Sequence, residues 1–212
     1  HSIAEGRLNA ITEGEWEVTE IVGMSPNKKT IYYMSTETSP LERNLYSIKL
    51  NGKGKKRITT EAGTYSINFS RGLKYYTSRF SNLTTPTITS IHTADGKLVR
   101  MIEDNAKLKQ TLEENGVPQR EFFTFKNSMD ITLNGFMIKP NNFDPNKKYP
   151  VFMTQYSGPG SQQVANRWQM SWEDALVQEG YIVVCVDGRG TGYRGAEFRK
   201  CTYGNLGYFE VI

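Results

Sequence analysis

The sequence predicts a chain of mixed class, in which two repeated units of short β-strands precede an alternating α/β segment. Two observations carry this prediction. Roughly the first hundred residues repeat at a period of 43, the interval from Tyr32 to Tyr75, and residues 150–195 hold two apolar runs separated by a helical pattern. Composition agrees, because 212 residues with 37% hydrophobic and 23% charged side chains are typical of one large globular domain or two small ones.

Each repeated unit predicts four strands. Ile31-Tyr32-Tyr33 is followed by Ser47-Ile48, and one period later Lys74-Tyr75-Tyr76 is followed by Ser90-Ile91. Turn-forming residues separate the strands, at 25–27, 51–52, 70–72 and 95–96. Four strands in a period of about 40 to 50 residues are typical of a β-propeller blade, and the alternative is a plain antiparallel meander.

The charge balance excludes one class of partner. The net charge of +4, from 26 basic and 22 acidic residues, is too mild to indicate nucleic-acid binding. The basic cluster at 53–57 follows the turn Asn51-Gly52 and is expected to be a solvated hairpin end. The sequence has no run of about 18 apolar residues and no signal-peptide pattern at His1, so we expect the chain as given to be soluble.

Histidine and cysteine are too few and too scattered to indicate a metal site. The histidines are His1 and His92, the cysteines are Cys185 and Cys201, and no pair among them has ligand spacing. We therefore expect neither a metal nor a cofactor. His92 is expected to pack or to face solvent, Cys185 is expected to be buried in its apolar run, and a disulfide between the two cysteines stays open.

Residues 104–120 predict a linker with a short polar helix. This helix is expected to begin near Asp104 and to end at Asn115-Gly116. Two strands, at 122–125 and 131–139, are then expected around a turn at 127–130. The expected domains are the repeated units at 1–103, the linker at 104–120 and the α/β part at 121–212.

The α/β part is organised around two apolar runs, at 150–155 and 181–187. Joined by a helix of about three turns, they predict a parallel β-α-β unit that is buried on both faces. The helix is expected to have Ser171 as its N-cap, with Asp174 three residues on, and to end at Gly180. Its apolar face is expected to hold Trp172, Ala175 and Leu176.

Both apolar runs lead into glycine-rich turns, at 156–162 and 187–195. In open α/β sheets, functional sites lie in the loops beyond the carboxyl ends of the strands. We therefore expect Tyr156 and Asp187 to enter two adjacent turns, and we expect the site to lie there.

Several motifs resemble the dipeptidyl peptidase IV group of the prolyl oligopeptidase family. In the α/β part they are Tyr156-Ser-Gly-Pro-Gly-Ser-Gln162, Asp187-Gly-Arg-Gly-Thr-Gly-Tyr-Arg-Gly195 and Gly207-Tyr-Phe-Glu-Val211. Upstream, Ile11-Thr-Glu-Gly-Glu-Trp-Glu-Val18, Arg43-Asn-Leu-Tyr46 and Leu98-Val-Arg-Met-Ile-Glu-Asp-Asn105 resemble the closing propeller blades and their exit. The resemblance covers nearly the whole chain.

This resemblance implies a mixed fold class: β-propeller blades (partial), the last two of the propeller, followed by the N-terminal part of an α/β-hydrolase domain that is truncated at residue 212. It implies a serine exopeptidase that releases N-terminal dipeptides, Xaa-Pro or Xaa-Ala, from peptide substrates without a cofactor. It also implies a homodimer as the full-length protein, in a periplasmic, secreted or membrane-tethered extracytoplasmic location. The substrate's amino terminus is held, by the same resemblance, by residues of earlier propeller segments.

Tyr156 is the one catalytic residue that the resemblance places in this chain, with its hydroxyl stabilising the tetrahedral oxyanion. The position agrees, because one oxyanion donor of an α/β-hydrolase comes from the loop after the third strand. The alternative is that Tyr156 packs at a strand end. The sequence has no Gly-x-Ser-x-Gly and no histidine after His92, so the chain as given is expected to be inactive. The resemblance implies that the Ser/Asp/His triad lies beyond residue 212.

Two other functions stay open. Gly190-Thr-Gly192-Tyr-Arg-Gly195 follows a strand and Glu210 lies about twenty residues on, which would fit a dinucleotide-binding domain. A non-catalytic interaction protein would instead use the blades as a binding surface. A sheet that stops after its early strands is also expected to leave an unpaired edge through which the isolated chain self-associates.

Overall fold

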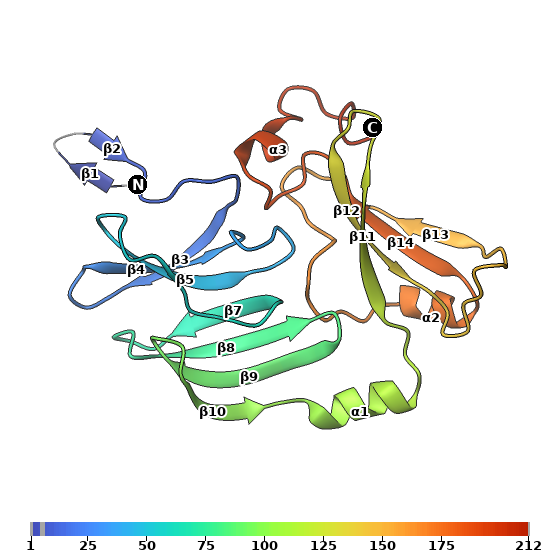
Figure 1. Cartoon of the computed structure of the whole chain (residues 1–212), viewed down its shortest axis with the longest axis horizontal. Helices are drawn as coiled ribbons and strands as arrows, with labels where there is room; N and C mark the ends of the chain where they lie inside the picture. Colours follow the sequence, from blue (N-terminus) through green and yellow to red (C-terminus); the bar gives the residue numbers. More distant parts are fainter. Residues whose placement is uncertain (1, 5–6, 212) are drawn as a thin grey trace. The chain divides into compact units, whose positions relative to one another are not determined.

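The computed structural model describes residues 2–4 and 7–211, which form two compact units (Figure 1). The first unit comprises His1–Ser81, Thr87–Asp104 and Tyr193–Ala196, and the second comprises Asn82–Pro86, Asn105–Gly192 and Glu197–Ile212. We describe each unit by itself.

The first unit is built from two four-stranded antiparallel sheets. The first sheet has the order β3 (Val18–Met24), β4 (Thr30–Ser35), β5 (Asn44–Lys49) and β6 (Lys56–Arg57). The second has the order β7 (Thr64–Phe69), β8 (Tyr75–Asn82), β9 (Thr85–Thr93) and β10 (Leu98–Glu103), and a ribbon of β1 (Ser2–Ala4) and β2 (Arg7–Asn9) precedes both. The sequential order confirms the prediction of four strands per repeat, which both a propeller blade and a meander would have.

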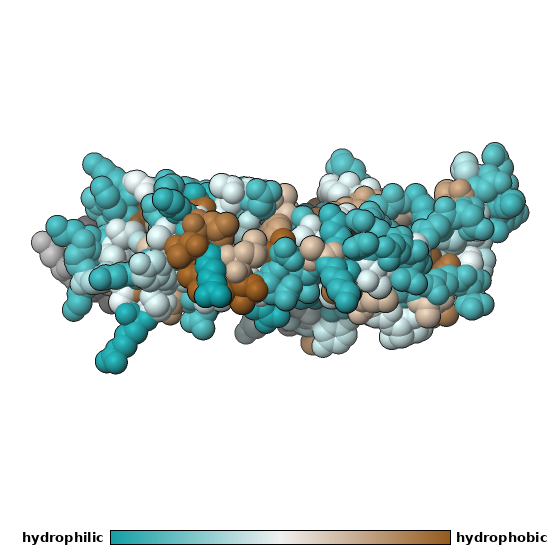
Figure 2. All heavy atoms as spheres, turned by 90° about the horizontal axis from the view of Figure 1, so that it is seen from below, coloured by the Kyte–Doolittle hydropathy of each residue, from teal (hydrophilic) through white to brown (hydrophobic). Residues whose placement is uncertain are grey.

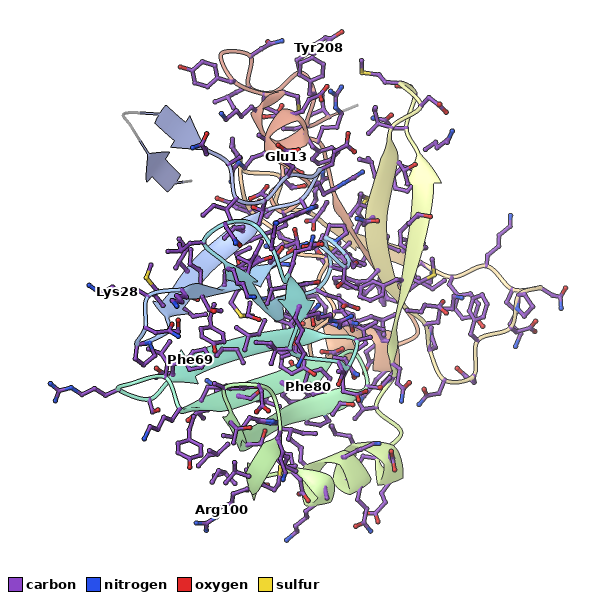
Figure 3. The ribbon with its side chains drawn as sticks, turned by 60° about the vertical axis from the view of Figure 1, so that its left-hand side comes forward. Glu13, Lys28, Phe69, Phe80, Arg100 and Tyr208 are labelled. Atoms are coloured by element: carbon purple, nitrogen blue, oxygen red, sulfur yellow. The ribbon has the colours of Figure 1, made fainter. Side chains whose placement is uncertain are left out.

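Apolar side chains from both repeats meet in a shared cluster in this unit. Met34, Leu45 and Ile58 of the first repeat are buried together with Ile67 and Tyr76 of the second. The rings extend this cluster: Phe69 lies with its centroid 4.9 Å from that of Tyr32 and 5.3 Å from that of Tyr76. Figure 3 shows Phe69 and Phe80 on neighbouring strands of the second sheet. The inward-facing apolar residues of the strands in both repeats thus pack together, as the repeated pattern predicts.

Every residue of the edge strand β10 is exposed, its apolar side chains included. Leu98, Val99, Met101 and Ile102 are all exposed. Figure 2 shows an apolar patch on the face of the molecule where β10 lies. β10 pairs with β9 with two shifts of register, and such irregularities are common at the edges of sheets.

The second unit contains a mixed sheet. Its strands are β11 (Arg120–Lys126), β12 (Thr132–Ile138), β13 (Val151–Thr154) and β14 (Ile182–Asp187), in the order β11-β12-β14-β13. The pairs β11–β12 and β12–β14 are antiparallel, while β13 and β14 are parallel and are connected through α2 (Glu173–Gln178). The predicted β-α-β unit and the preceding hairpin are therefore confirmed.

The helix in this unit is shorter than predicted. α2 has 6 residues instead of about three turns, and Trp172 replaces Ser171 as its N-cap residue. Asp174 and Val177 are its buried residues, and Trp172 is exposed. Trp172 already has backbone angles in the helical region, and the Ser171 N–H donates to the Asp174 carboxylate at 2.6 Å, so the predicted contact at the helix start forms in a shorter helix.

The prediction that both faces of the β-α-β unit are buried was wrong for β13. Among the described strands β13 pairs with β14 alone, and on one of its faces the Phe152 ring meets the ring of Trp172, the residue before α2, edge to face at 5.4 Å. Val151 and Met153 point the other way and are 61% and 55% exposed. One six-residue helix covers too little surface to bury both faces of the pair.

The remaining helices are short. α1 (Ala106–Glu114) lies inside the predicted linker, with Asn105 as N-cap residue, Asn115 as C-cap residue and Gly116 at φ 58°. α3 (Ala196–Lys200) follows the second glycine-rich turn. No helix in the described part of the chain is long and apolar enough to cross a membrane. The domain boundaries at residues 103, 104–120 and 121 stay a prediction.

Candidate active site

Tyr156 lies just beyond the carboxyl end of β13, with its side chain 63% exposed. Its ring lies over Gly158, since a Cβ atom built on Gly158 would stand 3.0 Å from the Cζ and Oη atoms of Tyr156. That distance is tighter than most Cβ contacts, so a side chain at 158 would make the phenol shift by a few tenths of an ångström. The hydroxyl is thus accessible at the end of a strand.

Hydrogen bonds inside the following turn give it a defined shape. The Ser161 hydroxyl donates to the carbonyl oxygen of Gly158 at 2.6 Å, and it also lies 3.1 Å from the carbonyl oxygen of Tyr156. The Gln155 side-chain amide donates to Ser157 Oγ at 2.6 Å. Ser161 therefore connects the end of the turn to the backbone of Tyr156 itself.

The two glycine-rich turns lie side by side, as the sequence predicts. The Gly160 N–H donates to the carbonyl oxygen of Gly190, and the Gly192 N–H donates to that of Ser161, both at 2.9 Å. A Cβ atom built on Gly192 would stand 2.8 Å from the carbonyl oxygen of Gly160. The absence of a side chain at 192 is what allows this close approach.

Asp187, the last residue of β14, holds the other end of the first turn. Its carboxylate accepts the Gln163 N–H on Oδ1 at 2.9 Å and the Val164 N–H on Oδ2 at 2.8 Å, and the residue is 6% exposed. Burial raises the pKa of this carboxyl above its usual value, although the two backbone donors oppose the rise. Sequence analysis located Asp187 at the site but did not predict this role.

A second buried acid, Asp174, was predicted at the start of the helix, but its ion pair was not. Asp174 of α2 lies 3.6 Å from the guanidinium of Arg120 on β11, with both side chains 7% exposed. Asp174 also accepts the Ser171 N–H at 2.6 Å, and the Arg120 guanidinium lies 4.7 Å from the centre of the Phe136 ring. A Ser-x-x-Asp pattern before a helix was the available signal, and it indicates only the local bond.

The glycine motif at Gly190 and Gly192 is packed against other segments of the protein. A Cβ atom on Gly190 would stand 2.5 Å from the Thr202 side chain, and that on Gly192 would meet Gly160. A dinucleotide motif instead needs its glycines for close approach of a pyrophosphate at the start of a helix. The helix that follows, α3, has only 5 residues. This geometry does not favour a dinucleotide-binding domain.

The histidine and cysteine positions serve packing. His92 stacks on Tyr76 with ring centroids 5.2 Å apart, and its two nitrogens lie 2.8 Å from Ser90 Oγ and 3.1 Å from the Gly96 carbonyl oxygen. Cys185 is buried, Cys201 is partly buried, and both are free thiols. Burial raises the pKa of the Cys185 thiol, which makes it a poor nucleophile.

Two segments of the chain match models of known protein families. Residues 2–87 match the family model described as the dipeptidyl peptidase IV N-terminal region, and residues 168–211 match the model of the prolyl oligopeptidase family. Tyr156 lies between these two matched segments.

Individual relatives cover nearly the whole chain. A dipeptidyl-aminopeptidase B of Aspergillus niger is 35% identical over 95% of this chain and 23% of its own length. A probable dipeptidyl peptidase 4 of Aspergillus flavus is 33% identical over 99% of this chain and 28% of its own length. The crystal structure of Porphyromonas gingivalis dipeptidyl peptidase 4 superposes with a TM-score of 0.90 at 42% identity, over 97% of this chain and 29% of the other.

The chain thus spans about a quarter of the length of the relatives that it matches. The matches include both the blade region and the α/β region, which confirms the predicted fold class of propeller blades followed by part of an α/β-hydrolase domain. The chain is therefore related to the dipeptidyl peptidases of the prolyl oligopeptidase family.

Proposed function

We propose that the protein containing this chain is a serine exopeptidase that releases N-terminal dipeptides Xaa-Pro or Xaa-Ala from peptides. The observation that carries the proposal is the exposed Tyr156 hydroxyl at the carboxyl end of β13, in a sheet similar to that of a dipeptidyl peptidase 4. Such strand ends are where open α/β sheets place their sites.

Tyr156 has the chemistry for the role of oxyanion donor. When a serine attacks a peptide carbonyl, the carbonyl oxygen becomes negative, and a fixed O–H donor stabilises it more than the neutral substrate. A phenol meets this need if it is accessible and held in place, and Tyr156 is 63% exposed beside Gly158. Loss of one such donor typically lowers the rate about 100- to 1,000-fold, or roughly 3–4 kcal/mol.

The 212-residue chain by itself is proposed to be inactive. Its sequence has no Gly-x-Ser-x-Gly for a nucleophile and no histidine after His92, while the hydrolase triad follows the chain order Ser, Asp or Glu, His. The triad is proposed to lie in the part of the longer protein that follows residue 212. The longer protein is also proposed to be a homodimer located outside the cytoplasm.

The test is release of a chromophore from a Gly-Pro amide by four proteins. They are the 212-residue chain, the full-length protein, and the full-length protein with Tyr156→Phe or with Tyr75→Phe. Tyr75 is a matched control because it is an exposed tyrosine on β8, in the first unit. We expect activity in the full-length protein and in its Tyr75→Phe variant, none in the 212-residue chain, and at least a 100-fold lower kcat with Tyr156→Phe. An inactive full-length protein would favour the interaction function.

A further inference from the structure

The loop that carries Tyr156 contains no helix or strand, yet it is held at two separate places by the last residue of β14 and by the turn that follows it. We propose that Asp187 and Gly192 are positioning residues that fix loop 156–164 and, through it, the Tyr156 hydroxyl. This inference rests on the proposed function, because it assigns these two residues to the same oxyanion site.

The first attachment is the Asp187 carboxylate. Its two oxygens each accept one of two consecutive backbone N–H groups, from Gln163 at 2.9 Å and Val164 at 2.8 Å. Val164 is fully buried and Asp187 is nearly so, which means that water cannot replace these bonds at low cost. Hydrogen bonds to an ionised acceptor are stronger than neutral ones, so the carboxylate fixes the far end of the loop.

The second attachment is the pair of backbone bonds between the two turns. Gly160 donates to Gly190, and Gly192 donates to Ser161, both at 2.9 Å. The backbone of Gly192 is not in the left-handed region, so its glycine identity is explained by space alone: a Cβ atom there would stand 2.8 Å from the Gly160 oxygen. Any larger residue at 192 must push the two turns apart.

A continuous set of contacts leads from the second attachment to Tyr156. The Ser161 backbone carbonyl accepts the Gly192 N–H, and the Ser161 hydroxyl lies 3.1 Å from the carbonyl oxygen of Tyr156. The Tyr156 ring then lies over Gly158 within the same turn. A shift of the turn at 160–161 is therefore transmitted to the backbone of Tyr156, and a displacement of about 1 Å is enough to lower a rate about 100-fold.

The test uses the full-length protein with Asp187→Asn, Gly192→Ala or the control Asp130→Asn. Asparagine at 187 keeps one acceptor oxygen but turns an amide donor toward the other N–H, so one of the two bonds is lost. Asp130 lies in the exposed turn between β11 and β12, with its side chain 80% exposed, and asparagine tolerates its φ of 61°. Hydrogen exchange should become faster at Gln163 and Val164 in Asp187→Asn, and it should stay unchanged in Asp130→Asn.

Kinetics separate positioning from general stability. With kcat expressed per titrated active site, we expect Asp187→Asn and Gly192→Ala to lower kcat about 10- to 100-fold with KM changed less than threefold. In the Tyr156→Phe background, we expect Asp187→Asn to cause no further decrease in kcat, because its effect acts through the phenol.

The possible results are distinct. Suppose that Tyr156→Phe lowers kcat. If Asp187→Asn then leaves kcat unchanged, or lowers it by the same factor in the wild-type and Tyr156→Phe backgrounds, this inference is overturned and the proposed function stands. If Tyr156→Phe leaves kcat unchanged in an active enzyme, the oxyanion assignment fails and this inference fails with it. Gly192→Ala provides the second variant should Asp187→Asn fail to fold.

Discussion

Removal of the Asp174 carboxylate is expected to destabilise the second unit strongly. Asp174→Ala deletes an ion pair to Arg120 at 3.6 Å and a hydrogen bond from the Ser171 N–H at 2.6 Å, both at side chains that are 7% exposed. Arg120 stays charged, and its Nε atom is buried with no hydrogen-bond partner among the described residues. It keeps its contacts with the Ser171 hydroxyl and the Phe136 ring.

The magnitude follows from that environment. Breaking a buried pair by removing one partner typically costs about 3–5 kcal/mol, because the other charge is left buried and uncompensated. The exposed pair between Lys126 and Asp130 is the control, since its side chains are 62% and 80% exposed and such pairs contribute about 0–1 kcal/mol. Asp130→Asn removes this charge, and asparagine tolerates the φ of 61° at this position, so the replacement should change the stability by less than about 1 kcal/mol.

Hydrogen exchange of β11 and α2 in the full-length protein measures the local free energy of opening and avoids the assumption of two-state unfolding. Asp174→Ala should lower that free energy by about 3–5 kcal/mol. The double replacement of Arg120 by Met and Asp174 by Leu should recover most of the loss, because no unpaired charge remains. A loss below about 1 kcal/mol for Asp174→Ala, equal to that of the exposed control, would refute the reasoning.

Three further predictions concern the site, its pH dependence and the sheet edge. Gly158→Ala should lower kcat about tenfold without a change in Tm, because a Cβ atom there would stand 3.0 Å from the Tyr156 ring. Burial raises the folded-state pKa of Asp187 above its unfolded value, so the stability that this residue contributes should be present at low pH and should decrease as the pH rises from about 4 through the folded-state pKa. The measurement is Tm as a function of pH for the wild type and for Asp187→Asn. Parallel curves for the two proteins would contradict this prediction. The isolated 212-residue chain should form oligomers in light scattering that Val151→Lys reduces, since Val151 is 61% exposed on edge strand β13; a wild-type monomer would contradict this.

The strands of the fold were predictable because the information for them is local. The turn residues at 25–27 and 51–52 and the recurring Tyr-Tyr pairs at 32–33 and 75–76 gave the strand order that the structure shows. The length of α2 was not predictable, because the residues before Glu173 could continue a helix as far as local preference is concerned. In the structure residues 165–171 contain no helix, and the Ser171 N–H at the start of α2 donates to the Asp174 carboxylate.

The candidate site was likewise predictable from the sequence only in part. The adjacency of the two turns follows from parallel strands that end at one edge of a sheet, so Tyr156 and Asp187 could be assigned to it from the sequence. The use of Asp187 as an anchor and the pairing of Arg120 with Asp174 depend on which elements the complete fold brings together. Neither residue pair has a spacing that a sequence motif would reveal.

The most direct test of the central claim is the kcat of the full-length protein on a Gly-Pro chromogenic amide, with and without the Tyr156 hydroxyl. The account predicts that Tyr156→Phe lowers kcat by at least about 100-fold while Tyr75→Phe leaves it unchanged. An active full-length enzyme in which Tyr156→Phe and Tyr75→Phe have equal kcat values would contradict the assignment of Tyr156 to the oxyanion site.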